Sequence, residues 1–247
     1  LNNPLLLFIF NFMKNFEIKK IGIIDGMGAF AGAKFFQILL EKINQKGLPF
    51  PEIILNAISI DDFIADRSKI IPAKRIISQR IKFFNQQKVS MIVMACNTAH
   101  IMHGDLEKIA KCPFPSIIDL VVKKIKTDKI ERVGILASPT TLRTKLYEDK
   151  LVKSGIVPIV PNKRFQKILE EIIRKVLNGS LLDSDVKEFS KETRKFLVRN
   201  QMKGVILGCT ELPLAFPKSD FSDIKIFDSL DILADAVVEH LNVRISL

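Results

Sequence analysis

Short apolar runs alternate with longer amphipathic runs along this 247-residue chain. The short runs are rich in Ile and Val, as buried strands are, and the longer runs repeat apolar residues at helical spacing. Strand and helix alternate throughout, which predicts an α/β protein built on parallel sheets. The predicted strands cover 20–24, 53–58, 91–95, 133–137, 156–160, 205–207 and 224–227. The predicted helices cover 33–44, 72–84, 98–110, 142–153, 165–177, 185–198 and 230–241.

The pattern occurs twice. Segments 21–23 and 133–135, both of the form apolar-Gly-apolar, are 112 positions apart, and Cys96 and Cys209 are 113 apart. A diverged internal duplication explains this offset, and its period is longer than that of solenoid repeats. We therefore expect two similar Rossmann-like or flavodoxin-like domains related by a pseudo-two-fold axis, with the active site in the cleft between them. The expected domains are 13–116 plus 229–247, and 117–228, with 1–12 a non-native or disordered leader.

Composition narrows the class of protein. With 47% hydrophobic residues the chain can bury a sizeable core. Three cysteines, an odd number without a dense spacing pattern, argue against a disulfide scaffold and for a reducing compartment, so we expect a cytoplasmic protein. The apolar run 5–10 is too short to span a bilayer and lacks the features of a signal peptide, so no membrane association is expected.

The net charge of +11 raises the question of a nucleic-acid partner. The basic residues are spread over several predicted helices, and no nucleic-acid-binding motif is present. Aromatic residues do not interleave with the basic ones, Trp is absent and Tyr occurs once. Solvated helix faces explain this distribution better than a nucleic-acid interface does. A positive field would also attract a small acidic substrate.

The two cysteines are the strongest functional signal. Each follows an apolar strand and precedes small polar residues, in the segments MACNTAH (94–100) and LGCTELP (207–213). Ligands of parallel α/β sheets bind outside the carboxyl ends of the strands, so both thiols are expected at one crevice. Two thiols on opposite sides of a cleft could act on both faces of one carbon atom.

Other sites were weighed against this interpretation. The glycines of segment 26–32 form a loosened dinucleotide fingerprint, but they also suit any anion at a helix N-terminus. A zinc site using Cys96, His100, His103 and Cys112 is disfavoured, because one continuous helix would separate the two cysteines by about 24 Å. A cysteine hydrolase with His100 as base leaves Cys209 without a role. His103 and His240 are expected at the surface, and Cys112 in a structural position.

From position 19 to position 241 the chain resembles the cofactor-independent aspartate/glutamate racemases, and within them the aspartate racemases most closely. Two departures from the aspartate racemases matter: Asp25 stands where they carry Gly, and AFAG (29–32) stands where they carry Pro-Leu-Ala-Thr. Asp25 is similar to the glutamate branch, whereas Glu211, in place of the histidine usual in glutamate racemases, favours the aspartate racemases. The segments that carry the resemblance are IGIIDGMG (21–28), CNTAH (96–100), LASPTT (136–141), GCTE (208–211) and IFD (226–228).

The resemblance implies a role for each matching residue, and it implies no cofactor and no metal. Cys96 and Cys209 would act as a thiol and thiolate pair that exchanges roles with the hand of the substrate. Glu211 would steady the ammonium group, and Arg67, in a segment with Asn56, would hold the distal carboxylate. A second basic contact of the family falls at 175–177, where this chain has Leu177. The remaining expected substrate-binding residues are Gly26, Met27, Asn97, Thr98, Thr141 and Thr210.

The expected activity is the interconversion of L- and D-aspartate, and a homodimer is one possible assembly. Three alternatives remain open at this point. The first is a glutamate or broad-range amino-acid racemase, and the second is an isomerase of the maleate isomerase type that uses the same cysteine pair. The third is a catalytically silent amino-acid-binding or regulatory relative, which the retention of both thiols disfavours.

Overall fold

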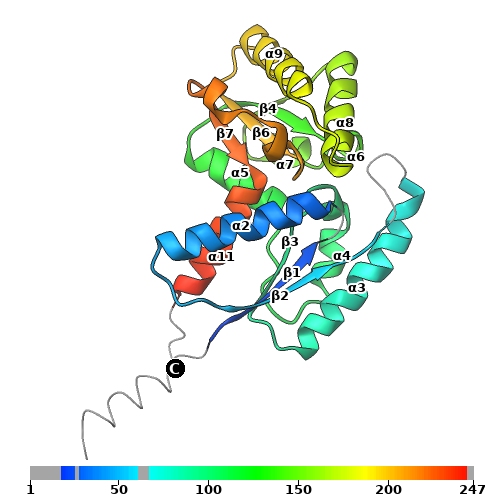
Figure 1. Ribbon diagram of the computed structural model, residues 1–247, viewed down its shortest axis with the longest axis vertical. Coiled ribbons are helices and arrows are strands. Elements are labelled where there is room, and N and C mark those ends of the chain that lie inside the picture. Colours follow the sequence, from blue (N-terminus) through cyan, green and yellow to red (C-terminus); the bar gives the residue numbers. More distant parts are fainter. Residues whose placement is uncertain (1–17, 26–27, 61–66, 244–247) are drawn as a thin grey trace, which may run out of the picture.

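The computed structural model describes residues 18–25, 28–60 and 67–243, without the side chains of Ala29 and Arg67. Two lobes each enclose a parallel sheet (Figure 1). The first sheet has the order β2-β1-β3 and the second β5-β4-β6-β7. The strands are β1 Lys20–Asp25, β2 Glu52–Ala57, β3 Met91–Met94, β4 Arg132–Ala137, β5 Val157–Ile159, β6 Gly204–Gly208 and β7 Lys225–Asp228. All pairings in these sheets are parallel, which confirms the predicted α/β class.

Helices cover the faces of both sheets. Their bounds are α2 Ala29–Gln45, η1 Arg67–Lys69, α3 Ile70–Gln86, η2 Thr98–Met102, α4 His103–Glu107, α5 Ile117–Thr127, α6 Pro139–Arg143, α7 Glu148–Lys153, α8 Lys163–Leu177, α9 Asp183–Arg199, α10 Leu212–Ala215, η3 Lys218–Phe221 and α11 Ser229–Asn242. One apolar core lies between the first sheet and α3, and a second lies between the other sheet and helices α8 and α9.

The two halves share a packing detail that supports the inferred duplication. In β1, a Cβ on Gly22 would lie 2.9 Å from the ring of Phe84, which comes from α3. In β4, a Cβ on Gly134 would likewise lie 2.9 Å from the ring of Phe196, which comes from α9. Both residues of the second pair are 112 positions after their counterparts. Each glycine therefore makes room for the equivalent phenylalanine of the helix packed on its strand.

The third core joins the halves. Its members come from β1, α2 and α11 on one side and from β4, α5 and α7 on the other. Although α11 is the last described helix, it packs on α2 of the first lobe, beside which it runs in Figure 1. Helix α5 contacts α7 and β7 as well as α11. This shared core fixes the two sheets relative to each other, although the domain bounds themselves stay predictions.

Two of the predicted helices were wrong. The helix expected over 98–110 is instead η2 followed by the short α4. The helix expected near 142–153 is divided into α6 and α7, because Lys145 adopts a left-handed conformation with φ of 52° between them. Helix α5 was not predicted at all, although Ser116 caps its first turn by accepting a hydrogen bond from the Asp119 amide.

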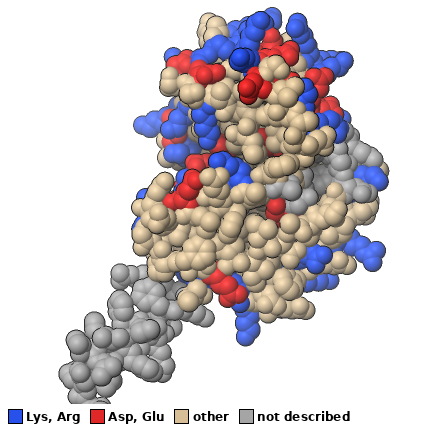
Figure 2. Space-filling view, viewed as in Figure 1, with Lys and Arg blue, Asp and Glu red and all other residues tan. Residues whose placement is uncertain are grey.

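Charged side chains of both signs mingle on the face shown in Figure 2, with Lys and Arg most numerous around the second lobe. Several basic residues pair with carboxylates. Lys42, for example, lies 2.6 Å from Asp235, and Arg194 lies 2.8 Å from Asp223. Within the part of the chain that the structure describes, every helix is too short or too polar to cross a bilayer.

Candidate active site

Each of the two expected cysteines stands in a turn at the carboxyl end of a strand. β3 ends at Met94, two residues before Cys96, and β6 ends at Gly208, directly before Cys209. Both side chains are buried, with 9% and 3% of their surface exposed. The charge of Cys96 contributes to raising the pKa of Cys209, so the two sulfur atoms lie within electrostatic reach of each other. The structure therefore brings together two thiols that are distant in sequence.

At least one backbone N–H group bonds to each sulfur, but burial has the larger effect on the pKa of each thiol. Burial and the nearby Glu211 carboxylate raise the pKa of Cys96 to about 12, although the amides of Ala99 and Thr98 act in the opposite direction. The same two causes raise the pKa of Cys209 well above its ordinary value, against the effect of the Glu211 amide. In this arrangement both sulfur atoms carry protons at neutral pH.

Glu211 contacts the second thiol directly. The Cys209 Sγ–H donates to Glu211 Oε2 at 2.9 Å, and the hydroxyl of Thr210 donates to the same oxygen at 3.2 Å. Burial raises the pKa of this carboxyl group. Gly28 makes room for it, because a Cβ there would lie 1.9 Å from Glu211 Oε1. The carboxylate is thus placed to accept the proton of Cys209, a contact that the sequence did not reveal.

A second buried carboxylate lies near the first thiol. Asp25 ends β1, and its charge is among the causes that raise the pKa values of Cys96 and Glu211. Gly32, in the first turns of α2, leaves room for it, because a Cβ on Gly32 would lie 1.7 Å from Asp25 Oδ2. The sequence singled out Asp25 only as a departure from the aspartate racemase pattern.

Three hydroxyl groups form a buried cluster beside Cys96. Thr98 Oγ1 lies 2.8 Å from Ser138 Oγ and 3.2 Å from Thr141 Oγ1, so the first and second halves meet here. Ser138 caps α6 by accepting a hydrogen bond from the amide of Thr141, and Pro139 stands at the first helical position. The sequence singled out both threonines as candidates but missed Ser138, although a serine followed by proline is a recognisable helix start.

Asn97 uses both functions of its side-chain amide. The Tyr147 hydroxyl donates to Asn97 Oδ1 at 2.5 Å, and Asn97 Nδ2 donates to Ser229 Oγ at 2.8 Å. Asn97 was expected among the groups that bind the substrate carboxylate, whereas its amide here joins two other elements of the protein. Neither Tyr147 nor Ser229 was singled out from the sequence, although Tyr147 is the only tyrosine of the chain.

The structure describes only some of the remaining expected site residues. Asn56 is half-buried in β2, where it pairs in register with Ile24 of β1. Leu177, at the family's second basic position, lies beside Gly28, while the Lys175 ammonium is paired with Asp185 at 2.6 Å. Gly26, Met27 and the side chain of Arg67 lie outside the described residues.

His100 has a structural role in the Cys96 turn. Its Nδ1 donates to the carbonyl oxygen of Cys96 at 2.7 Å, and its Nε2 accepts from the amide of Ile117 at 3.0 Å. An α-helix would direct the His100 amide to that carbonyl, but the amide bonds to Asn97 O instead, so the segment starts as a 3-10 helix. Burial lowers the pKa of His100 to about 3. With both nitrogens occupied, His100 is poorly suited to serve as the base of a cysteine hydrolase.

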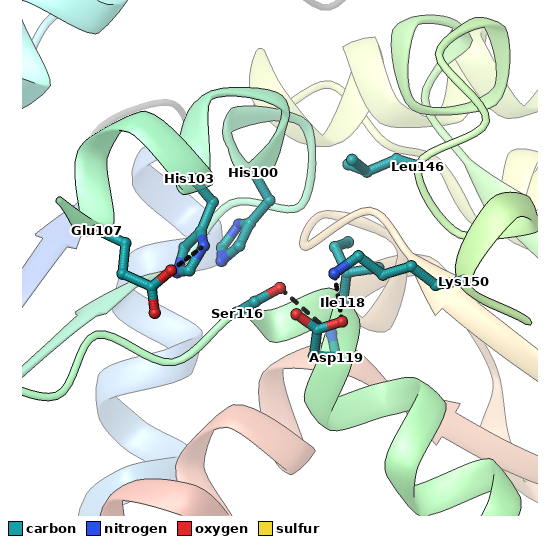
Figure 3. Close-up of a pocket in the computed structure, with 9 residues that line it drawn as sticks. His100, His103, Glu107, Ser116, Ile118, Asp119, Leu146 and Lys150 are labelled. Atoms are coloured by element: carbon teal, nitrogen blue, oxygen red, sulfur yellow. Dashed lines mark hydrogen bonds and ion pairs between the residues drawn. The ribbon is translucent and has the colours of Figure 1, made fainter. Parts of the chain in front are cut away.

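A pocket of about 310 Å³ adjoins this turn, and neither catalytic candidate cysteine lines it. The rings of His100 and His103 lie stacked on one side of it, and Lys150 approaches Asp119 on another (Figure 3). His103 was predicted at the surface, which is wrong: only 8% of it is exposed, and its Nε2 bonds to the carbonyl oxygen of Phe114. In the described chain, no three His, Cys, Asp or Glu residues are placed to hold a metal ion.

Over most of its length the chain is similar to proteins named as racemases or as a racemase homologue. The chain is similar to the structure of an aspartate racemase homologue from Pyrococcus horikoshii, with 29% identity, a TM-score of 0.78 and coverage of 91% of this chain and 100% of that one. For the aspartate racemase of Picrophilus torridus the identity is 27%, the TM-score 0.68 and the coverage 92% and 96%. The glutamate racemase of Helicobacter acinonychis is 26% identical over 242 residues, 92% of this chain and 88% of that protein.

A family model matches most of the chain and not only the two cysteine motifs. The model described as Asp/Glu/Hydantoin racemase matches residues 24–237. This span includes both cysteine turns, strands β2 through β7, the last two residues of β1 and most of α11. The chain therefore belongs to the Asp/Glu/hydantoin racemase family of amino-acid isomerases.

Proposed function

We propose that this protein interconverts L- and D-aspartate without a cofactor, with Cys96 and Cys209 as the acid–base pair. The observation that carries this proposal is the pair of buried thiols in equivalent turns of the two halves, close enough that the charge of Cys96 contributes to raising the pKa of Cys209. Inversion at an α-carbon requires a base on one face and an acid on the other. Two thiols of matched environment can exchange these roles.

The proton path follows from the contacts of Cys209. For one enantiomer, Cys209 passes its proton to Glu211, and the resulting thiolate removes the α-proton of the substrate. The electron pair of the broken C–H bond stays on the substrate as a carbanion. The Cys96 thiol then delivers its proton to the opposite face and becomes the thiolate. For the other enantiomer the roles of the two cysteines are exchanged: the Cys96 thiolate removes the α-proton, and the Cys209 thiol delivers its proton to the opposite face.

Carbanion formation next to a carboxylate requires neutralisation of that carboxylate. Thr98, Thr141 and Thr210, with backbone N–H groups of the two turns, are the proposed donors. Gly26 and Met27 are proposed to approach the substrate through their backbone. Arg67, together with Asn56, is proposed to hold the distal carboxylate, since a guanidinium group can bind it through two hydrogen bonds.

Aspartate is favoured over glutamate by Glu211, which stands where the glutamate racemases carry a histidine. It is also favoured by the similarity to the structures of one aspartate racemase and one aspartate racemase homologue. Glutamate is the second candidate. It is favoured by Asp25 and by the similarity of 92% of the chain to a glutamate racemase.

Proton exchange at the α-carbon tests the proposal. The purified protein is incubated with L-aspartate in heavy water with reductant and no added cofactor, and NMR follows loss of the α-proton while chirality is measured on the same sample. We expect exchange together with formation of D-aspartate. Cys96→Ala and Cys209→Ala should abolish both, while Cys112→Ala, which removes a half-buried thiol outside the two turns, should retain them.

Each other outcome points elsewhere. Full racemisation by Cys96→Ala or Cys209→Ala would contradict the two-base scheme. If the protein exchanges the α-proton of glutamate and not that of aspartate, glutamate becomes the proposed substrate. Absence of exchange with every amino acid would favour a binding protein.

A further inference from the structure

We propose that Tyr147, Asn97 and Ser229 form a hydrogen-bonded bridge that positions the two cysteine turns relative to each other. This inference rests on the proposed function, because it assigns to the bridge the alignment that the two-thiol reaction needs. The three residues are positioning residues, which act through the cysteines and do not contact the reacting atoms.

The bridge runs without interruption from one turn to the other. The Tyr147 hydroxyl donates to Asn97 Oδ1 at 2.5 Å, and Asn97 Nδ2 donates to Ser229 Oγ at 2.8 Å. The Ser229 hydroxyl donates in turn to the carbonyl oxygen of Leu207 at 2.8 Å. Asn97 directly follows Cys96, and Leu207 is separated from Cys209 by a single residue. The bridge therefore connects Asn97, beside Cys96 in sequence, with Leu207, close to Cys209 in sequence.

Tyr147 touches both turns by itself. Its hydroxyl bonds to Asn97, and its ring lies against Gly208, where a Cβ would be 2.9 Å from Tyr147 Cε2. The side chain is fully buried, with 0% of its surface exposed. Gly208 directly precedes Cys209, so the absence of a side chain there lets the ring approach the turn. A movement of either turn would strain one of these two contacts of Tyr147.

The position of the bridge in the fold distinguishes it from another hydrogen-bonded link made by α11. Ser229 begins α11, which packs on α2 of the first lobe, whereas Leu207 belongs to β6 of the second. Ser90 forms a comparable link far from the thiols, since its hydroxyl donates to Lys20 O at 3.1 Å and lies 3.0 Å from His240 Nε2 of α11. Ser229 acts at the carboxyl ends of the strands, and Ser90 acts at the amino ends.

This difference provides a matched experiment. We compare Tyr147→Phe and Ser229→Ala with Ser90→Ala, measuring kcat, KM and Tm for each racemisation direction. A misplacement of about 1 Å can cost on the order of 100-fold in rate. We therefore expect the two bridge variants to lose about 10- to 100-fold in kcat with KM changed less than about twofold. Ser90→Ala should lower Tm while retaining the wild-type kcat.

The double variant tests whether the residues act as one bridge. Because Tyr147 and Ser229 are linked through Asn97, Tyr147→Phe combined with Ser229→Ala should lose less kcat than the product of the two single losses. Multiplicative losses would show that the residues act separately and would overturn the bridge.

Other outcomes also decide the matter. Unchanged kcat in Tyr147→Phe, or a rise in KM alone, would overturn the bridge while leaving the proposed function in place. If the wild-type protein exchanges no amino acid, the proposed function fails first and the bridge's role fails with it. Tyr147→Phe removes only a hydroxyl group, so it keeps the proposal testable even if Ser229→Ala does not fold.

Discussion

Burial of the Cys96 thiol should make the folded state sensitive to alkali. Its pKa is about 12, against an ordinary value of 9.0. Between these values the unfolded chain has lost a proton that the folded chain retains, so the free energy of unfolding falls as pH rises. Each pH unit in that window is worth about 1.4 kcal/mol. From about pH 8 to about pH 10, Cys96 alone should therefore remove about 1.4 kcal/mol of stability.

Urea denaturation followed by circular dichroism, with reductant present, measures this effect. We compare the loss of unfolding free energy between the two pH values for the wild type, Cys96→Ala and Cys112→Ala, so that any constant cost of the substitution cancels. Cys96→Ala should lose about 1.4 kcal/mol less than the wild type over this interval. Cys112→Ala should differ less, because Cys112 is only half-buried. An equal loss in the wild type and Cys96→Ala would refute the argument.

Two further substitutions test the carboxylate beside Cys209. Glu211→Gln retains the shape of the side chain but removes the charge that raises the pKa of both thiols. The thiolates, titrated by ultraviolet absorbance, should therefore form at lower pH, and racemisation should slow. An unchanged titration would show that burial alone raises the pKa values. Gly28→Ala should displace Glu211 and strongly reduce racemisation, because the added Cβ would lie 1.9 Å from the carboxylate. The matched control is Gly104→Ala, which has open space around the added atom and should retain activity in the same assay.

Much of the fold could be predicted because strand and helix patterns are local. The seven predicted strands correspond to β1 through β7 with small shifts at their ends. One failure has a longer-range cause. The helix expected after Cys96 is disrupted because the His100 ring takes the Cys96 carbonyl and receives the Ile117 amide, a partner 17 positions away. No periodicity in a short window can report such a contact.

Some residues of the candidate site could likewise be predicted from local sequence patterns, and others could not. Cys96 and Cys209 stand out because each follows an apolar run and the two runs are related by duplication. The bond between Cys209 and Glu211 depends on how the turn folds, and the space for Glu211 comes from Gly28 on a different element. Tyr147 gave no local signal, since a lone tyrosine near a helix has no pattern that points to Asn97. The sequence therefore singled out the two candidate thiols but not the side chains that contact the cysteine turns.

The buried thiols also predict how activity should depend on pH. A thiol of high pKa forms a stronger base when it ionises, which suits removal of an α-proton, but it is rarely ionised in the free protein. In the proposed reaction the substrate carries an ammonium group to the cluster of Cys96, Cys209, Glu211 and Asp25, and an added positive charge favours the thiolate.

The rising limb of kcat against pH, which reports the substrate complex, should consequently lie at lower pH than the rising limb of kcat/KM, which reports the free protein. Both profiles are measured from initial rates of D-aspartate formation across the alkaline range, with Ser90→Ala as a control whose two limbs should match those of the wild type. Coincident limbs would mean that the substrate does not change the ionisation of the thiols. The pKa of Cys96 and Cys209 in the free protein would then govern turnover directly, and activity at neutral pH would require another base.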